Sequence, residues 1–528
     1  MSSERLTLPQ LIRRWAHEQP DKPFVVTEDD ALTYAQLERA SGAVAGWFAA
    51  AGVGKGTRVG LLMPNGTAWP VVALGASRAG ATVVPLSTLL RPPELAAHLH
   101  TAGVEHLVIV ATFRGRDYLA DLAAISPELA PGEGLFVAAL PRLRSITVWD
   151  DGRPDQPPED PSREFLDALD AAIRPADDLA IIFTSGSRGL PKGVIHTHGG
   201  ALGATEAGLD ARRLGRDDRL YIPMPFFWVG GFGTGLLSTL IAGATLLTEA
   251  QPQPERTLPF LERERVTLFR GWPDQAVALA QHPRFATTDL GSLRAGSLDA
   301  VLPADLRAAP GTPPNLLGMT ESFGPYCSDR LDRAVPAGKE GSCGRPFAGI
   351  EVRIVDVETR APVAPDVVGE IELRGPNMMR GICGRTRSEV FTEDGFYPTG
   401  DLGRLDADGY LFLTGRLDDM FKVRGATVYP SEVEGALRTI AGVQRAFVVD
   451  VVRDGTPEVG AAVVLAPGNA STVADLDREA RARLSSFKVP MHWAIVDDLP
   501  VMATGKLDKP ALQRMFETAE ATARTHDR

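Results

Sequence analysis

Short apolar runs alternate along most of the chain with segments whose apolar residues recur every three or four positions. The periodic segments, among them Tyr34–Ala51 and Ala68–Ala79, predict amphipathic helices. The short runs predict strands at Arg58–Met63, Ala81–Leu86, His106–Val110, Leu179–Phe183, Ala244–Thr248, Val266–Phe269 and Asn315–Leu317. This alternation indicates the α/β class, with helices layered against sheets.

The pattern changes after residue 350. Strands become denser, and they are expected at Glu351–Val357, Gly369–Arg374 and Tyr410–Thr414. The last hundred or so residues form a separate pattern of predicted elements: a helix opened by Tyr429–Glu432 and running to Leu437, paired strands Val443–Val452 and Val459–Leu465, and helices Val473–Leu484 and Pro510–Thr522. We therefore expect a large layered α/β body followed by a small α+β domain.

Length and charge narrow the class of protein. A chain of 528 residues exceeds one hydrophobic core, so at least two domains are expected. Its net charge of −12 argues against nucleic acid or an anionic membrane as the main partner. Only Cys327, Cys343 and Cys383 occur, without a CxxC pair, so neither a disulfide framework nor a zinc site is indicated. A reducing, cytoplasmic location fits this cysteine usage.

One uncharged stretch, between Arg219 and Glu249, is long enough to cross a bilayer. It contains two prolines and several glycines, which make a poor lipid-exposed helix. We expect a strand, a loop and a buried helix that line an apolar cavity, and no integral membrane segment. The N-terminus, Met1–Gln19, lacks the apolar region of a signal peptide.

The loop Thr184–Gly193, with the sequence TSGSRGLPKG, directly follows the predicted strand Leu179–Phe183. Its small residues suit a loop whose backbone N–H groups and hydroxyls surround an anion, with Lys192 adding charge. A polyphosphate such as that of ATP is the natural ligand, and a small-residue surface turn is the alternative. The loop does not match the Walker A pattern. His196 and His198 follow it, and we favour polar residues near a helix start over metal ligands.

Further clusters of polar residues occur in order along the chain. Gly318-Met319-Thr320-Glu321 follows a predicted strand, where sites in α/β proteins gather. Thr399-Gly400-Asp401 is expected in a turn and offers a carboxylate that a ribose diol would need. Gly415–Asp419 is expected at the junction of body and small domain, and Thr504-Gly505-Lys506 on a loop near the C-terminus.

In this order and spacing the motifs resemble those of the adenylate-forming superfamily, in its acyl-CoA synthetase (acid–thiol ligase) branch. The resemblance runs from LTYAQLERAS near the N-terminus to TGKLDK near the C-terminus. It implies that the loop holds the β and γ phosphates of ATP, that Glu321 is the magnesium-associated carboxylate, and that Lys506 catalyses adenylation. The ATP- and AMP-binding residues it implies are Thr184, Ser185, Gly186, Ser187, Arg188, Gly189, Lys192, Gly318, Met319, Thr320, Asp401 and Arg416, with Thr320 also contacting the α-phosphate.

The same resemblance implies a mobile lid. Residues 1–417 would form the AMP- and acyl-binding domain, and residues 418–528 a C-terminal lid that rotates about a hinge near Asp418. One lid face would bring Lys506 to the site for adenylation, and the other would bring Gly425 to the thiol tunnel. Lys422 and Arg424 lie near this second face and are expected to meet phosphates of coenzyme A.

Several positions depart from the family pattern. Arg188 replaces a threonine in the phosphate loop, and Leu317 replaces the aromatic residue that commonly stacks on adenine. Trp228 occupies a gate position where many relatives have histidine, so it either gates the acyl tunnel or packs as a core residue.

The acid is expected to lack a free α-amine, because Pro225–Gly231 contains no carboxylate to pair with a buried ammonium. The apolar segment with Phe227, Trp228, Val229 and Gly233 favours a fatty, alicyclic or aryl acid. We expect ATP, Mg²⁺ and coenzyme A as the small molecules. The alternatives are an acyl-AMP ligase that loads an acyl carrier protein and a non-catalytic adenylate-binding relative.

Overall fold

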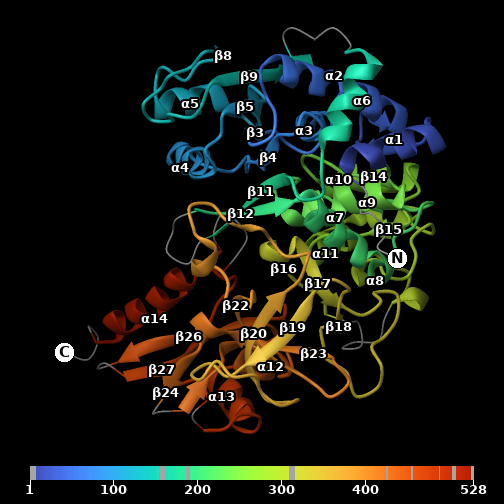
Figure 1. The fold of residues 1–528 in the computed structure, drawn as a ribbon. Helices are drawn as coiled ribbons and strands as arrows, with labels where there is room; N and C mark the ends of the chain where they lie inside the picture. The colour runs from blue at the N-terminus through green and yellow to red at the C-terminus, as the bar shows by residue number, and fades with distance from the viewer. Residues whose placement is uncertain are drawn as a thin grey trace. The chain divides into compact units, whose positions relative to one another are not determined.

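The computed structural model describes residues 7–150, 153–154, 161–185, 191–307, 315–423, 426–453, 456–486, 488–501 and 507–524. The chain forms two compact units (Figure 1). The first comprises Met1–Val352 and Leu373–Tyr397, and the second Arg353–Glu372 and Pro398–Arg528. The chain crosses between them more than once because the strand Gly369–Arg374 pairs with the strand Tyr397–Leu405, which lies in the later part of the second unit. The hinge near Asp418 stays a prediction.

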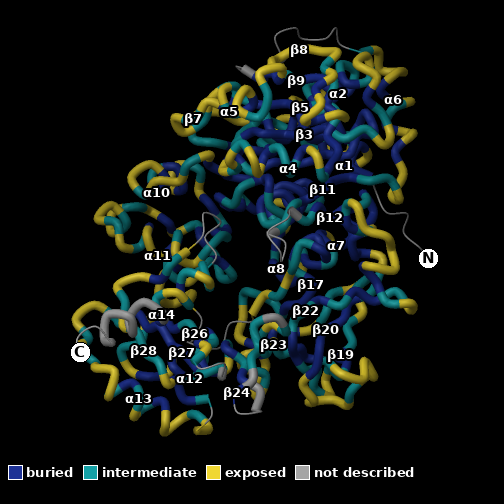
Figure 2. The backbone as a smooth tube through the Cα atoms, turned by 90° about the vertical axis from the view of Figure 1, so that its left-hand side faces the viewer, coloured by how far each residue is buried: buried dark blue, intermediate teal, exposed yellow. Residues whose placement is uncertain are grey.

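The larger sheet of the first unit has the strand order β10-β9-β5-β3-β4-β11-β12-β21. Its strands are β3 (Arg58–Leu62), β4 (Thr82–Pro85), β5 (His106–Ile109), β8 (Gly132–Glu133, paired with β9), β9 (Ser145–Asp150), β10 (Arg153–Pro154), β11 (Asp178–Ser185), β12 (Pro191–Thr197) and β21 (Gly381–Ile382). Strands β9, β5, β3, β4 and β11 run parallel. Nearly every residue of β3, β4 and β5 is buried, as in sheets covered on both faces (Figure 2).

The smaller sheet has the order β15-β13-β14-β1-β2 and is parallel except for the edge strand β2. Its strands are β1 (Pro23–Val26), β2 (Ala31–Thr33), β13 (Arg219–Tyr221), β14 (Thr245–Leu247) and β15 (Leu268–Phe269). One apolar core joins both sheets, since Val59 and Leu179 of the larger sheet cluster with Leu246 of the smaller one.

Helices fill the space between the sheets and cover their outer faces. The shared core includes residues of α1 (Leu8–Glu18), α2 (Tyr34–Ala50), α3 (Ala68–Arg78), α7 (His198–Ala207), the π-helix η1 (Gly230–Leu237) and α9 (Ser238–Ala242). Residues of α4 (Pro92–Ala102) and α5 (Tyr118–Ile125) pack on the other face of the larger sheet. Residues of α10 (Pro254–Arg263) and α11 (Pro273–Gln281) pack on the other face of the smaller sheet.

Shorter elements complete the first unit. They are β6 (Thr112–Phe113), β7 (Arg116–Asp117), α6 (Arg163–Ala172), α8 (Leu209–Arg212), η2 (Pro283–Thr287), η3 (Asp299–Val301), η4 (Ala304–Leu306), β16 (Leu317–Met319), η5 (Thr320–Ser322), β17 (Gly324–Ser328), β18 (Arg345–Pro346) and η6 (Arg387–Glu389). The α/β class expected from the alternating pattern is confirmed.

The second unit combines a four-stranded sheet with a small α+β layer. The sheet has the order β19 (Glu351–Val355), β20 (Gly369–Arg374), β22 (Tyr397–Leu405), β23 (Leu411–Arg416). The other elements are η7 (Leu417–Asp419), β24 (Phe421–Val423), β25 (Ala426–Val428), α12 (Pro430–Arg438), β26 (Val443–Arg453), β27 (Thr456–Leu465), α13 (Val473–Arg481), β28 (His492–Ile495) and α14 (Lys509–Arg524). Strands β26 and β27 pair, as expected, and the pairing is antiparallel.

Alternating residues of β26 and β27 face opposite sides of their sheet. Val448 and Val463 cluster with residues of α12 and α13, whereas Val449 and Val464 cluster with Leu512 of α14. The period-two pattern of these strands therefore builds a core on each face.

The uncharged stretch between Arg219 and Glu249 forms β13, η1, α9 and β14, so it contains the predicted strand and buried helix, and the apolar cavity that it was expected to line stays a prediction. Over the described ranges, the structure contains no helix whose length and apolar character suffice to span a membrane.

Candidate active site

The hairpin of β11 and β12 carries the two ends of the predicted phosphate loop. Thr184 lies opposite Lys192, and Ser185 opposite Pro191, in the antiparallel register. The turn that joins them contains Gly186, Ser187, Arg188 and Gly189, which lie outside the described residues. Strand β11 is parallel to β4, so the turn emerges at the carboxyl edge of the parallel strands, where ligands bind in this kind of sheet.

The Gly318–Glu321 motif spans the end of β16 and the 3-10 turn η5 that leads into β17. Gly318 and Met319 belong to β16, which starts and ends two residues later than expected, and Thr320 and Glu321 belong to η5. A Cβ at Gly318 would lie 2.6 Å from the carbonyl oxygen of Gly324, so only glycine fits this approach of two backbones. The turn closes at Phe323 with a φ of 55°, in the left-handed region.

Lys192 and Glu321, predicted from separate motifs, form an ion pair in the first unit. The Tyr397 hydroxyl donates a hydrogen bond to Oε1 of Glu321 (2.9 Å) and accepts one from Nζ of Lys192 (2.8 Å). Burial raises the pKa of Glu321, but the charge of Lys192 and these hydrogen bonds outweigh it and lower the pKa overall. Glu321 is therefore ionised at neutral pH although it is only 5% exposed.

Tyr397 was not predicted as a site residue. It follows Gly395-Phe396 in a segment without a recognisable motif, and only tertiary structure brings its hydroxyl to Glu321. The ring of His196, also in the first unit, packs edge-on against Phe323 with centroids 4.8 Å apart.

Both histidines after the phosphate loop are buried. His196 lies in β12 and His198 begins α7, and they are 0% and 1% exposed. Burial lowers the pKa of each to about 4, although Glu321 partly offsets this for His196 and Asp177 for His198. Among the residues that the structure describes, neither belongs to a group of three or more metal-ligating side chains.

These histidines predict an acid-sensitive fold. Unfolded histidine binds a proton near pH 6.5, whereas the folded protein resists protonation until about pH 4. The unfolded chain therefore binds more protons in this window, so stability is full above pH 7 and falls as the pH drops from 6.5 towards 4. The two groups together contribute a slope of up to about 2.7 kcal/mol per pH unit.

Urea unfolding between pH 7.5 and 5 measures this slope. In the double variant His196→Asn, His198→Asn, unfolding should take up about two fewer protons, so the slope of the unfolding free energy with pH should fall correspondingly. This expectation does not depend on the stability of the variant at pH 7.5. The exposed His17 supplies the control variant His17→Asn, which should leave the slope unchanged. An unaltered slope in the double variant would contradict the assignment.

The predicted acyl segment leads into the π-helix η1. A Cβ at Gly231 would lie 2.1 Å from the carbonyl oxygen of Pro225, and one at Gly233 would lie 3.0 Å from the ring of Phe323. The glycines thus let the helix pack tightly against the turn that follows Glu321. π-Helical turns occur frequently at functional sites.

Aromatic rings gather beside this helix. Trp228 contacts Phe227, with ring centroids 5.1 Å apart, and Trp272, with centroids 5.6 Å apart; both contacts are edge-to-face. Trp228 is half-buried rather than a closed core residue. Trp272 was missed because its motif, Gly-Trp-Pro after β15, has no distinctive chemistry in the sequence.

In the second unit, Asp401 and Arg416 face each other across β22 and β23. Arg416 Nη1 lies 2.8 Å from Oδ1 of Asp401 and donates to the carbonyl of Thr399. The expected turn at Thr399-Gly400-Asp401 was wrong, since these residues lie within β22. The strand deviates locally at Gly400, whose φ of 71° lies in the left-handed region that favours glycine, and a Cβ there would lie 3.1 Å from Arg416 Nη2.

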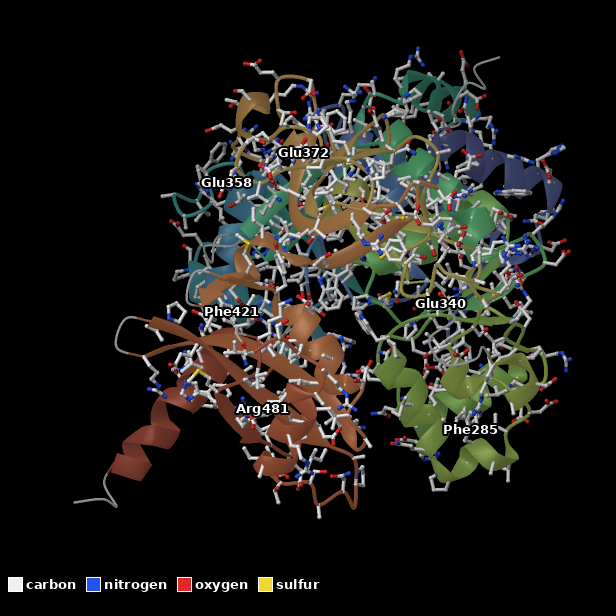
Figure 3. All side chains as sticks on the ribbon, turned by 90° about the horizontal axis from the view of Figure 1, so that it is seen from below. Phe285, Glu340, Glu358, Glu372, Phe421 and Arg481 are labelled. Atoms are coloured by element: carbon white, nitrogen blue, oxygen red, sulfur yellow. The ribbon has the colours of Figure 1, made fainter. Side chains whose placement is uncertain are left out.

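Two buried carboxylates, those of Glu370 and Glu372, hold the backbone near Gly400 in place. Glu370 accepts a hydrogen bond from the backbone N–H of Gly400 (3.0 Å) and pairs with Arg360. Glu372, labelled in Figure 3, accepts from Arg353 Nε (2.6 Å) and from Arg360. The orientation of the Asp401 strand is therefore held by ion pairs within the second unit.

The remaining predicted residues belong to the second unit. Asp418 lies in η7, directly before Asp419, which pairs with Lys509 (2.5 Å), and Lys422 lies in β24. Arg424, Gly425 and Lys506 lie outside the described residues. The structure thus brings Thr184, Lys192 and the Gly318–Glu321 motif together in one unit and pairs Asp401 with Arg416 in the other.

The Glu321 carboxylate fits the magnesium that the resemblance implies. Both of its side-chain hydrogen bonds go to Oε1, and within the described ranges Oε2 accepts none from a side chain. Mg²⁺ in nucleotide sites is held by one or two carboxylates together with phosphate oxygens and water. Glu321 would hold the ion, and ATP and water would supply its other ligands.

Comparison with known proteins shows the family of the chain. Residues 12–383 match the model of the AMP-binding enzyme family, and residues 432–506 that of the AMP-binding enzyme C-terminal domain. A 3-[(3aS,4S,7aS)-7a-methyl-1,5-dioxo-octahydro-1H-inden-4-yl]propanoyl:CoA ligase of Mycobacterium tuberculosis is 34% identical over 541 residues, covering 98% of this chain and 100% of the relative.

Two further similarities agree with this. A feruloyl-CoA synthase of an Amycolatopsis species is 34% identical over 512 residues, covering 95% of this chain and 98% of the relative. The crystal structure of ATP-bound MatB from Rhodopseudomonas palustris superposes with a TM-score of 0.77 at 25% identity, covering 97% of this chain and 99% of that chain. The chain therefore belongs to the family of AMP-binding enzymes, in the acyl-CoA ligase branch of the adenylate-forming superfamily.

Proposed function

We propose that this ATP-dependent acid–CoA ligase acts on a ring-bearing carboxylic acid that lacks an α-amino group. The observation that carries the proposal is the edge-to-face contact of Trp228 with Phe227 and Trp272 beside the glycine-rich π-helix. Aromatic walls of this kind favour flat or alicyclic apolar groups. Two relatives support this choice, because their names specify a fused bicyclic propanoyl group and a feruloyl group.

In the first half-reaction a carboxylate oxygen of the acid attacks the α-phosphorus of ATP, forming the acyl–adenylate bond and releasing pyrophosphate. Both reactants are anionic, so the site must neutralise negative charge as it redistributes. We assign this task to Lys192 and the phosphate loop for the β and γ phosphates, and to Lys506 for the carboxylate and α-phosphate. Thr320 would contact the α-phosphate and Asp401, aligned by Arg416, the ribose hydroxyls.

In the second half-reaction the sulfur of coenzyme A attacks the acyl carbonyl, its proton is lost, and AMP leaves. Rotation of the lid about Asp418 would remove Lys506 and bring Lys422, Arg424 and Gly425 towards the thiol. Magnesium held by Glu321 would neutralise phosphate charge in the first half-reaction. We place the reaction in the cytoplasm, where free thiols such as Cys327, Cys343 and Cys383 persist.

ATP–pyrophosphate exchange across a panel of acids tests the proposal. Aryl and alicyclic propanoic acids should support exchange with kcat/KM at least about tenfold above that of acetate or an α-amino acid, because they bury more apolar surface. Trp228→Ala should remove most of this preference and Trp228→Phe should retain it. Thioester formation with coenzyme A, and not with a holo-carrier protein, completes the test.

Exchange supported only by short-chain acids or by amino acids would contradict the proposed class of acid substrate. ATP binding without exchange for any acid would favour a non-catalytic relative. A thioester formed on the carrier protein alone would identify an acyl-AMP ligase.

A further inference from the structure

One amide side chain, that of Asn65, joins the carboxyl ends of strands from both sheets of the first unit. Asn65 follows β3 of the larger sheet, and Thr248 follows β14 of the smaller one. Asn65 Nδ2 donates a hydrogen bond to the Thr248 hydroxyl (2.9 Å), which in turn donates to the carbonyl of Ile222 after β13 (3.1 Å). Since α/β proteins bind ligands beyond the carboxyl ends of parallel strands, this amide lies at the edge where a substrate is expected.

The same amide holds the backbone that leads into the acyl segment. Asn65 Nδ2 also donates to the carbonyl of Met224 (3.0 Å), and its Oδ1 accepts from the N–H of Phe226 (2.8 Å). A backbone N–H only donates and a carbonyl only accepts, so these two partners fix the orientation of the amide. The side chain is 9% exposed, and hydrogen bonds shielded from water in this way hold their partners firmly.

Two prolines explain why a side chain is needed at this point. Pro223 and Pro225 follow β13 directly and carry no N–H for a sheet ladder. Asn65 instead offers a donor to Met224 and an acceptor to Phe226, the residues on either side of Pro225. One amide therefore replaces a neighbouring strand as the support of this turn.

The turn that Asn65 holds leads directly to Trp228. The carbonyl of Pro225 accepts a hydrogen bond from the N–H of Trp228 (3.1 Å). A Cβ at Gly231 of η1 would lie 2.1 Å from the same carbonyl oxygen, so turn and π-helix touch backbone to backbone. Close-packed backbones transmit a displacement, so a shift of the turn also moves Trp228.

The ring of Phe226 is held from the same part of the chain. It is fully buried and packs against Trp69 of α3, with ring centroids 5.2 Å apart. Trp69 also contacts Phe232 of η1, with centroids 5.3 Å apart. Because Asn65 and Trp69 are four residues apart, one short segment after β3 holds both the backbone and the rings of the acyl segment.

We propose that Asn65 is a positioning residue that sets the acid preference of the ligase. It acts through the backbone of Met224 and Phe226, which fixes the place of Trp228 beside Trp272. This role rests on the proposed function, in which Trp228 contacts the ring of the acid. A residue that only stabilised the fold would change the stability of the enzyme without changing the KM for the acid.

Pyrophosphate exchange by the full-length Asn65→Ala variant tests the proposal. The KM for the acid that the wild type uses best should rise about tenfold, because a displaced Trp228 loses contacts with the substrate, while the KM for ATP stays within about twofold. The ratio of kcat/KM between the best and the worst acid of the panel should fall correspondingly. Hydrogen–deuterium exchange followed by mass spectrometry should show the Phe226 amide about tenfold less protected.

Asn65→Asp keeps the test valid if Asn65→Ala does not fold. It retains the size of the side chain and the acceptor for Phe226 but loses both donors, and its carboxylate repels the carbonyl of Met224. The acid KM and the protection of the Phe226 amide should therefore change in the same direction.

Asn377→Ala is the matched control. Asn377 is another buried asparagine of the first unit, and its Nδ2 donates to the carbonyl of Ala348 (3.0 Å). This variant should lose stability and yet keep the acid preference and the protection of the Phe226 amide.

An unchanged acid KM or an unchanged protection of the Phe226 amide in the Asn65 variants would overturn the proposal. A wild-type enzyme without a preference for ring-bearing acids would instead contradict the proposed function, since the ratio between its own best and worst acids still tests Asn65.

Discussion

The Lys506→Ala variant should lose acyl-adenylate formation by about 10³-fold while making thioester from supplied acyl-AMP at a rate within about threefold of wild type. The loss follows because one positive charge must bridge the carboxylate and the α-phosphate as charge moves between them, and removing such a donor costs about 10²–10³-fold or more. In the proposed mechanism the second half-reaction uses the other lid face, so it does not need this lysine.

Two assays separate these outcomes. ATP–pyrophosphate exchange measures adenylation, and release of AMP from acyl-AMP and coenzyme A measures thioester formation. Lys488→Ala is the matched control, since Lys488 belongs to the same unit and pairs with the exposed Glu432. Equal loss of both half-reactions in Lys506→Ala would argue against a lid with two working faces.

The Glu321→Gln variant should lower the rate of pyrophosphate exchange about 10²-fold and raise the magnesium concentration needed for half-maximal exchange. Glutamine retains the size of the side chain and can still accept from Tyr397. It removes the negative charge that pairs with Lys192 and that we propose to hold the cation.

Exchange rates measured across a magnesium titration test this prediction. Glu358→Gln, at an exposed position labelled in Figure 3, should behave like the wild type. Tyr397→Phe should lose less than about tenfold, because it removes one neutral hydrogen bond. A Glu321→Gln enzyme with unchanged rate and magnesium dependence would remove Glu321 from the proposed role.

Local sequence predicted many elements closely. The expected helix Tyr34–Ala51 is α2 (Tyr34–Ala50), where Thr33 caps the first turn by accepting from the N–H of Gln36. Gly369–Arg374 forms β20 with the expected bounds. The bounds of such segments can be predicted because a helix cap, a glycine or an unbroken apolar run marks where the element begins or ends.

Other features could not be predicted from local pattern. Asp401 was expected in a turn because Thr-Gly-Asp is typical of turns, yet pairing with β23 holds it inside a strand. Tyr397 and Trp272 carry no local sign of function, and they draw attention only through their contacts with Glu321 and Trp228, which are distant in sequence.

The sequence by itself determined the α/β class, the ordered motifs and the chemical types of the side chains proposed to bind phosphate, because each depends on residues adjacent in the chain. Tertiary structure alone decided that Lys192, Glu321 and Tyr397 share hydrogen bonds and that Trp228 contacts both Phe227 and Trp272. The physical reason is that pKa shifts and ring contacts depend on burial and distance, which only the packed sheets create.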